Sequence, residues 1–124
     1  MPLEKIIVVG AGLSGLALSL GLAAEGKHVE ILEQRKDFSN RGATFGLNPA
    51  GIKALKELCP KVMSNLQDKG IMIPESNGLM FPWYEVRDAL LEEVCKQGKI
   101  IVRLGCEIKA IENGSTSVTV DFTS

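Results

Sequence analysis

IIVVGAGLSGLA, residues 6–17, joins a short apolar strand to a glycine-rich turn and then to a helix. Its three glycines have the GxGxxG spacing of dinucleotide-binding folds. The first permits the tight turn, the second lets a pyrophosphate approach the backbone, and the third lets helix and strand pack closely. The peptide dipoles at the start of the helix also favour a phosphate. We therefore expect a nucleotide cofactor to be bound by Gly10, Ala11, Gly12, Leu13, Ser14 and Gly15.

The spacing alone is weak evidence, because a chain with 13 glycines can contain such a triplet by chance. The residues that follow the glycines support the interpretation. Leu13 to Glu25 are rich in Leu and Ala and predict a helix that ends at the cap position Gly26. A second apolar segment, Val29 to Leu32, ends in Glu33, 18 residues beyond Gly15. At this spacing an acidic side chain reaches the ribose hydroxyls of a bound adenosine and disfavours a 2′-phosphate. The alternative is an ordinary βαβ unit with Glu33 exposed to solvent.

Composition narrows the class of protein. The chain has 124 residues, a length that fits a single domain over residues 1–124. Its formal net charge is −1 and no basic stretch alternates with aromatic residues, so we expect no nucleic-acid partner. No apolar run approaches the roughly 20 residues of a membrane span. The first strand begins at about Glu4, which leaves no room for a signal peptide, and we expect a cytoplasmic protein.

The residue types that commonly carry catalysis or metal binding are sparse. Cys59, Cys95 and Cys106 are odd in number and widely spaced, which favours reduced thiols in the core over a disulfide framework or a zinc site. His28 is the single histidine, so a catalytic triad and a multi-histidine metal site are excluded, and we expect it to be structural. The sequence predicts no metal and identifies no catalytic residue.

The segment after Glu33 departs from a simple nucleotide-binding pattern. Gln34 to Asn48 supply charge, glycine and turn residues, and residues from about 36 to 82 replace part of the usual βαβ continuation. Arg35 and Arg41 lie on the loop that leaves the carboxyl end of a strand, where open α/β sheets bind ligands. We predict that both contact phosphate or ribose oxygens. The alternative is that they are solvated loop arginines.

The middle of the chain predicts mainly helices. Asn48-Pro49 has the pattern of an N-cap followed by a proline in the first helical position, and Pro60 is expected to end that helix. Apolar residues repeat at four-residue spacing from Val86 to Val94, with Arg87 beside this stripe. The other expected elements are a helix at 61–69, two short strands within 71–81, a helix at 83–96 and a strand at 100–104.

The end of the chain predicts a hairpin. Asn113-Gly114 stands between Glu107–Glu112 and Thr116–Phe122, and Asn-Gly between such runs favours a tight turn. From Val118 to Phe122 apolar and polar residues alternate, which predicts one buried and one solvent-exposed face. The sequence thus predicts an α/β fold, with a Rossmann-like βαβ unit of parallel strands and a C-terminal antiparallel β-hairpin.

Four segments together resemble a known family over almost the whole chain: IIVVGAGLSGLALSLGLAAEGKHVEILEQR, RGATFGLNPAGIKALKEL, WYEVRDALLEEV and LGCEIKAI. They resemble the amino-terminal portion of the FAD-dependent aromatic hydroxylases, the flavoprotein monooxygenases typified by para-hydroxybenzoate hydroxylase. The resemblance implies that FAD is the cofactor and that the glycine turn binds its ADP half. The further cofactor contacts that it implies are Glu33, Gln34, Arg35, Arg41 and Arg87, with Glu107 and Ile108 near the adenine.

The resemblance also implies a reaction. Members of the family use NAD(P)H and O2 to hydroxylate or epoxidise an aromatic or other electron-rich small molecule. They continue into an Asp-Gly motif, a substrate domain and a Gly-Asp motif, for which residues up to Ser124 offer no counterpart. We therefore expect this chain to bind FAD through its ADP half without full catalysis. The alternatives are a non-catalytic ADP-binding module and a fragment of an NAD-dependent oxidoreductase.

The same architecture places a late strand beside the first strand. Without it, Lys5 to Val9 would form an apolar sheet edge, which invites pairing with another chain. We therefore expect a homo-oligomer or a partner chain at this edge.

Overall fold

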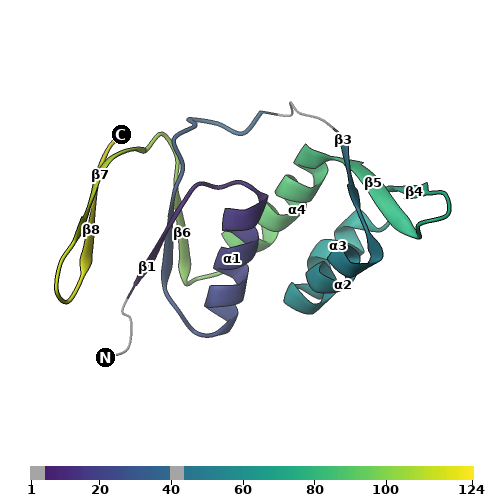
Figure 1. Ribbon diagram of the computed structural model, residues 1–124, viewed down its shortest axis with the longest axis horizontal. Helices are drawn as coiled ribbons and strands as arrows, with labels where there is room; N and C mark the ends of the chain where they lie inside the picture. The colour runs from purple at the N-terminus through teal and green to yellow at the C-terminus, as the bar shows by residue number, and fades with distance from the viewer. Residues whose placement is uncertain (1–4, 40–43) are drawn as a thin grey trace.

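A computed structural model of the chain describes residues 5–39 and 44–124 (Figure 1). The described elements are, in chain order, β1 (Ile6–Val9), α1 (Leu13–Ala24), β2 (Val29–Leu32), β3 (Thr44–Leu47), α2 (Pro49–Leu58), α3 (Pro60–Leu66), β4 (Ile71–Ile73), β5 (Gly78–Pro82), α4 (Trp83–Cys95), β6 (Ile100–Arg103), β7 (Glu107–Asn113) and β8 (Val118–Thr123).

The opening of the chain forms the predicted βαβ unit. β1 and β2 are parallel, with Val8 opposite Ile31. Leu16 and Leu20, four residues apart on α1, are buried in the same core. After α1, the backbone turns at Gly26 with φ 83°, a conformation that strains any residue with a Cβ. The Rossmann-like fold class is therefore confirmed.

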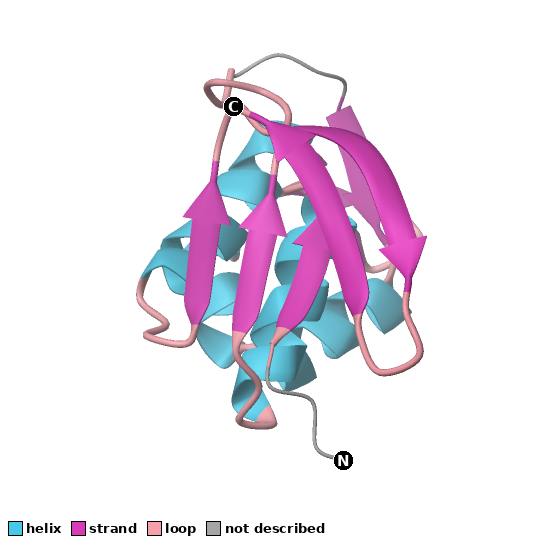
Figure 2. Cartoon of the chain, turned by 90° about the vertical axis from the view of Figure 1, so that its left-hand side faces the viewer, coloured by secondary structure: helices cyan, strands magenta, loops and turns pink. Residues whose placement is uncertain are grey.

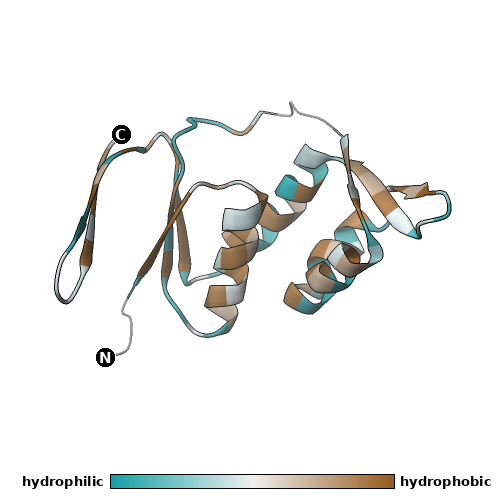
Figure 3. Cartoon of the chain, in the orientation of Figure 1, coloured by the Kyte–Doolittle hydropathy of each residue, from teal (hydrophilic) through white to brown (hydrophobic). Residues whose placement is uncertain are grey.

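β6 completes a parallel sheet of order β1-β2-β6, in which β1 and β6 are the edges. α1 and α4 lie together on one face of this sheet (Figures 1 and 2). The core forms between these layers because every second residue of a strand points to the same face. In Figure 3, β1 and α1 carry much of the brown that marks hydrophobic residues, as expected for elements that pack together in the core. Core residues from the three strands and two helices include Val8, Ile31, Ile100, Leu16 and Leu90.

A second, antiparallel sheet has the order β3-β5-β4. The pairing of β4 with β5 agrees with the two strands expected within 71–81. β3 was not expected, because the sequence analysis treats 34–48 as loop. Gly46 lies in the middle of β3 and weakens its strand pattern. The strand forms through its pairing with β5, where Phe45 lies opposite Phe81, and no local signal reports that contact.

The predicted break at Pro60 is confirmed: α2 ends at Leu58, just before it. Pro60 is itself the first residue of α3, one position before the start expected for that helix. A proline suits this position because the first helical N–H has no intrahelical acceptor. Cys59, between the two helices, has φ −156° and ψ 102°, the extended conformation that a following proline favours. At the other end of α2, the Asn48 side chain accepts a hydrogen bond of 2.8 Å from the Gly51 N–H, as an N-cap should.

β7 and β8 form the predicted hairpin, on the side of the parallel sheet away from α1 and α4 (Figure 1). The strands are joined by residues 114–117, where the Gly114 N–H donates to the Ser117 carbonyl at 2.7 Å. The prediction of one buried face on β8 is wrong: Val118 is 55% exposed and Phe122 is 40% exposed. No element of 5–39 or 44–124 packs over these side chains, so alternation alone does not bury them.

The three cysteines differ in burial. Cys106 is buried, Cys59 is half-buried, and Cys95 is exposed at the end of α4, so the prediction of core cysteines is wrong for Cys95. Its position follows the helix: Val94 faces the core and the next residue turns outward. The described part of the chain holds no group of three or more His, Cys, Asp or Glu side chains placed to bind a metal ion. Nor does it hold a helix long and apolar enough to cross a membrane.

A charged cluster crosses the parallel sheet at Glu30 of β2. The Glu30 carboxylate accepts hydrogen bonds from Lys5 Nζ, at 3.0 Å, and from Arg103 Nε. The Lys5 ammonium holds the pKa of the Glu30 carboxyl below its ordinary value of 4.5; burial opposes this effect and Arg103 adds to it. Because the folded-state pKa is lowered, the cluster contributes stability above the ordinary pKa and loses it as the pH falls through the folded value.

We expect Glu30→Gln to lower the free energy of unfolding at pH 7 by about 1–3 kcal/mol, the range for hydrogen bonds to charged groups. The difference from wild type should shrink as the pH falls below 4.5, the ordinary pKa of the carboxyl. Urea denaturation between pH 3 and 7 measures it. Glu57→Gln, on an exposed position of α2, is the matched control and should change stability by less than about 0.5 kcal/mol. A Glu30→Gln deficit that does not vary with pH would contradict this assignment.

Candidate functional site

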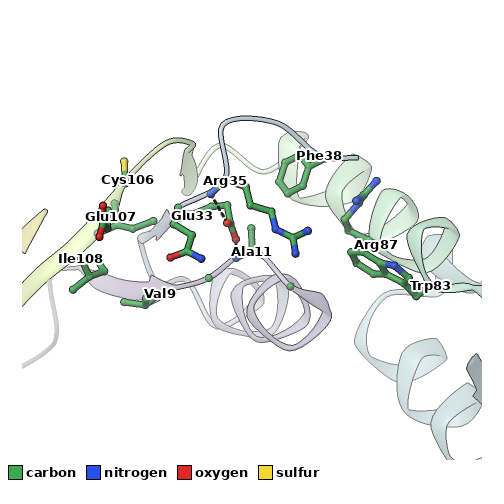
Figure 4. Close-up of a pocket in the computed structure, with 14 residues that line it drawn as sticks. Val9, Ala11, Glu33, Arg35, Phe38, Trp83, Arg87, Cys106, Glu107 and Ile108 are labelled. Carbon is green, nitrogen blue, oxygen red and sulfur yellow. Dashed lines mark hydrogen bonds between the residues drawn. The ribbon is translucent and has the colours of Figure 1, made fainter. Parts of the chain in front are cut away.

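A cavity of about 500 Å³ opens at the carboxyl ends of β1 and β2 (Figure 4). This volume falls in the usual range for small-molecule and cofactor sites. Three chain segments and one helix form its walls. They contribute Val9, Gly10, Ala11 and Gly12 at and after the end of β1, Leu32, Glu33, Gln34, Arg35 and Phe38 at and after the end of β2, Trp83 and Arg87 of α4, and Cys106, Glu107 and Ile108 before and within β7.

The three glycines of the turn differ in what the structure requires at each position. Gly10 has φ 99°, so a side chain there would be strained. At Gly15, a Cβ would lie 2.1 Å from the Gly10 carbonyl oxygen, so only glycine allows α1 to pack against the turn. Gly12 has φ −78° and ψ −175°, an extended conformation open to any residue, and a Cβ there would meet nothing within 4 Å. Neither strain nor packing in this chain requires a glycine at position 12.

The start of α1 is open to an anion. Gly12 is its N-cap and offers no side-chain acceptor, and no acidic residue stands in the first turn. The N–H groups at a helix start lack intrahelical acceptors and carry a partial positive charge. α2 differs, because its N-cap Asn48 already accepts from Gly51. Gly12, at this open helix start, lines the cavity, whereas Leu13, Ser14 and Gly15 lie just behind in the first turn of α1.

Glu33 lies at the centre of the cavity wall and is only 8% exposed. Its Oε1 accepts a hydrogen bond of 2.9 Å from the Ala11 N–H, and its Oε2 accepts one of 2.7 Å from the Arg35 N–H (Figure 4). The backbone of Glu33 also bonds to the segment between β6 and β7, since the Cys106 N–H donates to its carbonyl at 2.8 Å. The alternative of a solvated glutamate is therefore wrong: β2 delivers this carboxylate to the turn.

Arg87 is buried, at 1% exposure, which the sequence analysis did not anticipate. Its guanidinium carbon lies 5.2 Å from the ring centre of Phe38 and 5.0 Å from that of Trp83, within reach of a cation–π interaction. Nη1 donates to the Ser39 carbonyl at 2.7 Å, and Nη2 to Asp88 Oδ1 at 2.8 Å. Arg87 thus ties α4 to the loop after β2, and its own partners hold it at the cavity wall.

The structure brings most of the predicted site residues together. Gln34, Arg35, Glu107 and Ile108 line the same cavity as the glycine turn, although β7 lies over 90 residues further along the chain. Arg41 lies outside the described residues. Five further lining residues were not predicted from the sequence: Val9, Leu32, Phe38, Trp83 and Cys106.

One of the missed residues carried a signal in the sequence: Trp83 stands one helical turn before Arg87. An aromatic residue four positions from a helix arginine shares its face, so the pairing of Trp83 with Arg87 could have been proposed. Phe38 lies near the same guanidinium only because the loop after β2 contacts α4, which no local pattern in the sequence indicates.

Comparison with known families and structures agrees with this geometry. The NAD(P)-binding Rossmann-like domain matches residues 8–65. The FAD-dependent monooxygenase azaH of Aspergillus niger is 30% identical over 81 residues, which cover 65% of this chain and 18% of that protein. An FAD-dependent urate hydroxylase of Klebsiella oxytoca is 37% identical over 54 residues, or 44% of this chain and 14% of that protein.

These matches support an amino-terminal portion of the FAD-dependent aromatic hydroxylase-like family. The chain spans less than a fifth of the curated relatives cited above. Solved structures share its fold. Those of CtdE in complex with FAD and of the p-nitrophenol 4-monooxygenase PnpA from Pseudomonas putida superpose with TM-scores of 0.87 and 0.85, at 16% and 18% identity. The superposed regions cover 98% and 97% of this chain, and 35% and 37% of the CtdE and PnpA chains, respectively.

Proposed function

We propose that this chain binds FAD through its ADP half. The proposal rests on one observation: two groups that suit different parts of ADP lie in the same cavity of about 500 Å³. One is the open start of α1, which suits a diphosphate, and the other is the buried Glu33 carboxylate, which suits the hydroxyls of a ribose. The names of the related monooxygenases and the CtdE complex support FAD as the dinucleotide.

The cavity offers a place for each part of the ADP group. The diphosphate would lie against the N–H groups that follow Gly12, where no side chain blocks its approach. The ribose hydroxyls would donate to Glu33, whose carboxylate would repel a 2′-phosphate. The adenine would lie toward Glu107 and Ile108, on the opposite side of Glu33 from Arg87 (Figure 4).

The arginines would serve the phosphate side. Arg35 and Arg87 both line the cavity, and a guanidinium suits a diphosphate because it is always charged and donates in a fixed fork. Arg87 donates to Ser39 and Asp88, which hold the guanidinium at the cavity wall, and from there its positive charge would attract the phosphates. Arg41 is proposed as a further contact on the resemblance alone.

In a complete family member, bound FAD supplies the redox chemistry by which NAD(P)H and O2 hydroxylate or epoxidise an electron-rich small molecule. The residues of this chain would hold the ADP end of the cofactor and position it. We propose that the chain alone binds without full catalysis. We also propose that it forms one domain over residues 1–124 and acts in the cytoplasm.

The purified chain tests the choice of cofactor. We expect a flavin absorbance band in the purified protein and, by calorimetry, tighter binding of FAD than of NADH. The matching NAD(P)-binding Rossmann-like domain is the reason to include NADH, because it favours the alternative of an NAD-dependent oxidoreductase fragment. Tighter binding of NADH would overturn the proposal, and binding of ADP without any preference for FAD would favour a plain nucleotide-binding module.

The edge strand β1 supports a further proposal, that the chain pairs with a second copy or another chain there. Among the described residues β1 pairs only with β2, and unpaired strand edges recruit other strands. We expect light scattering at high concentration to report a dimer, which Ile7→Lys on β1 should dissociate by placing a charge beside the edge. The control Ile101→Lys, on the opposite edge strand β6, should leave the dimer intact. A monomeric wild type would contradict the proposal.

A further inference from the structure

The Glu33 carboxylate is already engaged before any ligand binds. Its two oxygens accept from the N–H groups of Ala11 and Arg35, at 2.9 and 2.7 Å. Ala11 lies between the first two glycines of the turn, and Arg35 lies on the loop after β2. One side chain therefore joins two separate segments of the cavity wall.

The backbone around Glu33 extends this connection to a third segment. The Gly10 N–H donates to the Leu32 carbonyl, and the Gly105 N–H donates to the Arg35 carbonyl, both at 2.8 Å. The Glu33 side chain bonds to the glycine turn at Ala11, the residue after Gly10 with its φ of 99°. Its removal would take the acceptor from the N–H of Ala11, a residue only 3% exposed, and an unpaired buried N–H is costly.

In this arrangement, different backbone N–H groups of the turn serve Glu33 and a bound diphosphate. The Ala11 N–H points to Glu33, so a diphosphate must use the N–H groups beyond Gly12 at the start of α1. A carboxylate has about four acceptor positions, and two remain for hydroxyl groups after the two backbone bonds. Glu33 can therefore hold the turn and accept from a ribose at the same time.

We propose that Glu33 is a positioning residue, which holds the glycine turn in the ligand-free protein in the conformation that receives a diphosphate. This inference rests on the proposed ADP site and adds a second role to the residue that would contact the ribose. If Glu33 acted only through ribose hydroxyls, its replacement would not matter for a ligand that lacks them. If it positions the turn, the replacement weakens every diphosphate ligand.

The test compares ADP with 2′,3′-dideoxyadenosine 5′-diphosphate on wild type and Glu33→Gln by calorimetry. A glutamine oxygen can accept only one of the two backbone bonds, because its NH2 group donates. We expect Glu33→Gln to bind the dideoxy ligand on the order of tenfold more weakly than wild type, the weight of one charge-assisted hydrogen bond. The control Glu57→Gln, exposed on α2, should bind as wild type does. Equal affinity of wild type and Glu33→Gln for the dideoxy ligand would overturn the inference.

A measurement without ligand separates this inference from the proposed function. Amide hydrogen exchange followed by NMR should show the N–H groups of Ala11 and Arg35 protected in wild type and faster in Glu33→Gln, with the Ile31 amide in the core unchanged. Unchanged exchange at Ala11 would overturn the positioning role even if ADP binds. A wild type that binds neither diphosphate would instead overturn the ADP site, while the exchange result still decides what Glu33 does to the turn.

Discussion

Gly15→Ala should lower the free energy of unfolding by about 4 kcal/mol or more, which is large against the 5–15 kcal/mol of a typical domain. The added Cβ would lie 2.1 Å from the Gly10 carbonyl oxygen and 3.2 Å from the Gly10 carbonyl carbon. Both atoms belong to the backbone, so no side chain can rotate away. Relief requires α1 to move from the turn, which opens the core around Leu16.

Urea denaturation followed by the fluorescence of Trp83, the single tryptophan, measures this loss. Gly12→Ala is the matched control, because a Cβ at Gly12 meets nothing within 4 Å and its backbone is extended. We expect the control to stay within about 1 kcal/mol of wild type. Equal stabilities of the Gly15→Ala and Gly12→Ala variants would contradict the packing role assigned to Gly15.

Gly12→Val should abolish nucleotide binding and leave the fold intact, with a loss of affinity for FAD and ADP of at least about 100-fold, or about 2.7 kcal/mol. The valine methyl groups would stand where the diphosphate must approach the start of α1. A Cβ at position 12 meets nothing within 4 Å and the backbone there is extended, so we expect a stability within about 1 kcal/mol of wild type.

The control for the binding experiment is Gly98→Val, at another glycine where a Cβ meets nothing within 4 Å but which lies after α4, away from the cavity. It should bind FAD with the affinity of wild type. Calorimetry measures the affinity of both variants for FAD, and circular dichroism checks that both are folded. If Gly12→Val still binds FAD tightly, the diphosphate does not lie at this turn.

The sequence predicted those parts of the site that depend on local pattern. The glycine spacing, the apolar strands around it and the acid 18 residues beyond Gly15 all lie within one βαβ unit, whose geometry is regular enough to place Glu33 at the turn. The stripe from Val86 to Val94 likewise located α4, because helical periodicity is a local property.

The parts that were missed depend on contacts between distant segments. β3 exists because Phe45 pairs with Phe81, and the burial of Arg87 depends on a loop some 48 residues earlier, whose Ser39 carbonyl accepts its hydrogen bond. Alternation in β8 predicted a buried face, yet burial requires a second layer, and none of the described elements supplies one to Phe122. Pattern specifies which face is apolar, whereas tertiary contacts decide whether that face is covered.

The central claim is that the cavity at the glycine turn holds the ADP half of FAD. The most direct test is a calorimetric titration of the wild-type chain with FAD, repeated in the presence of saturating ADP. We expect saturable binding of one FAD per chain that ADP displaces completely, because both ligands would occupy the same diphosphate and ribose positions. Binding of FAD that ADP leaves unchanged, or no binding of FAD at all, would contradict it.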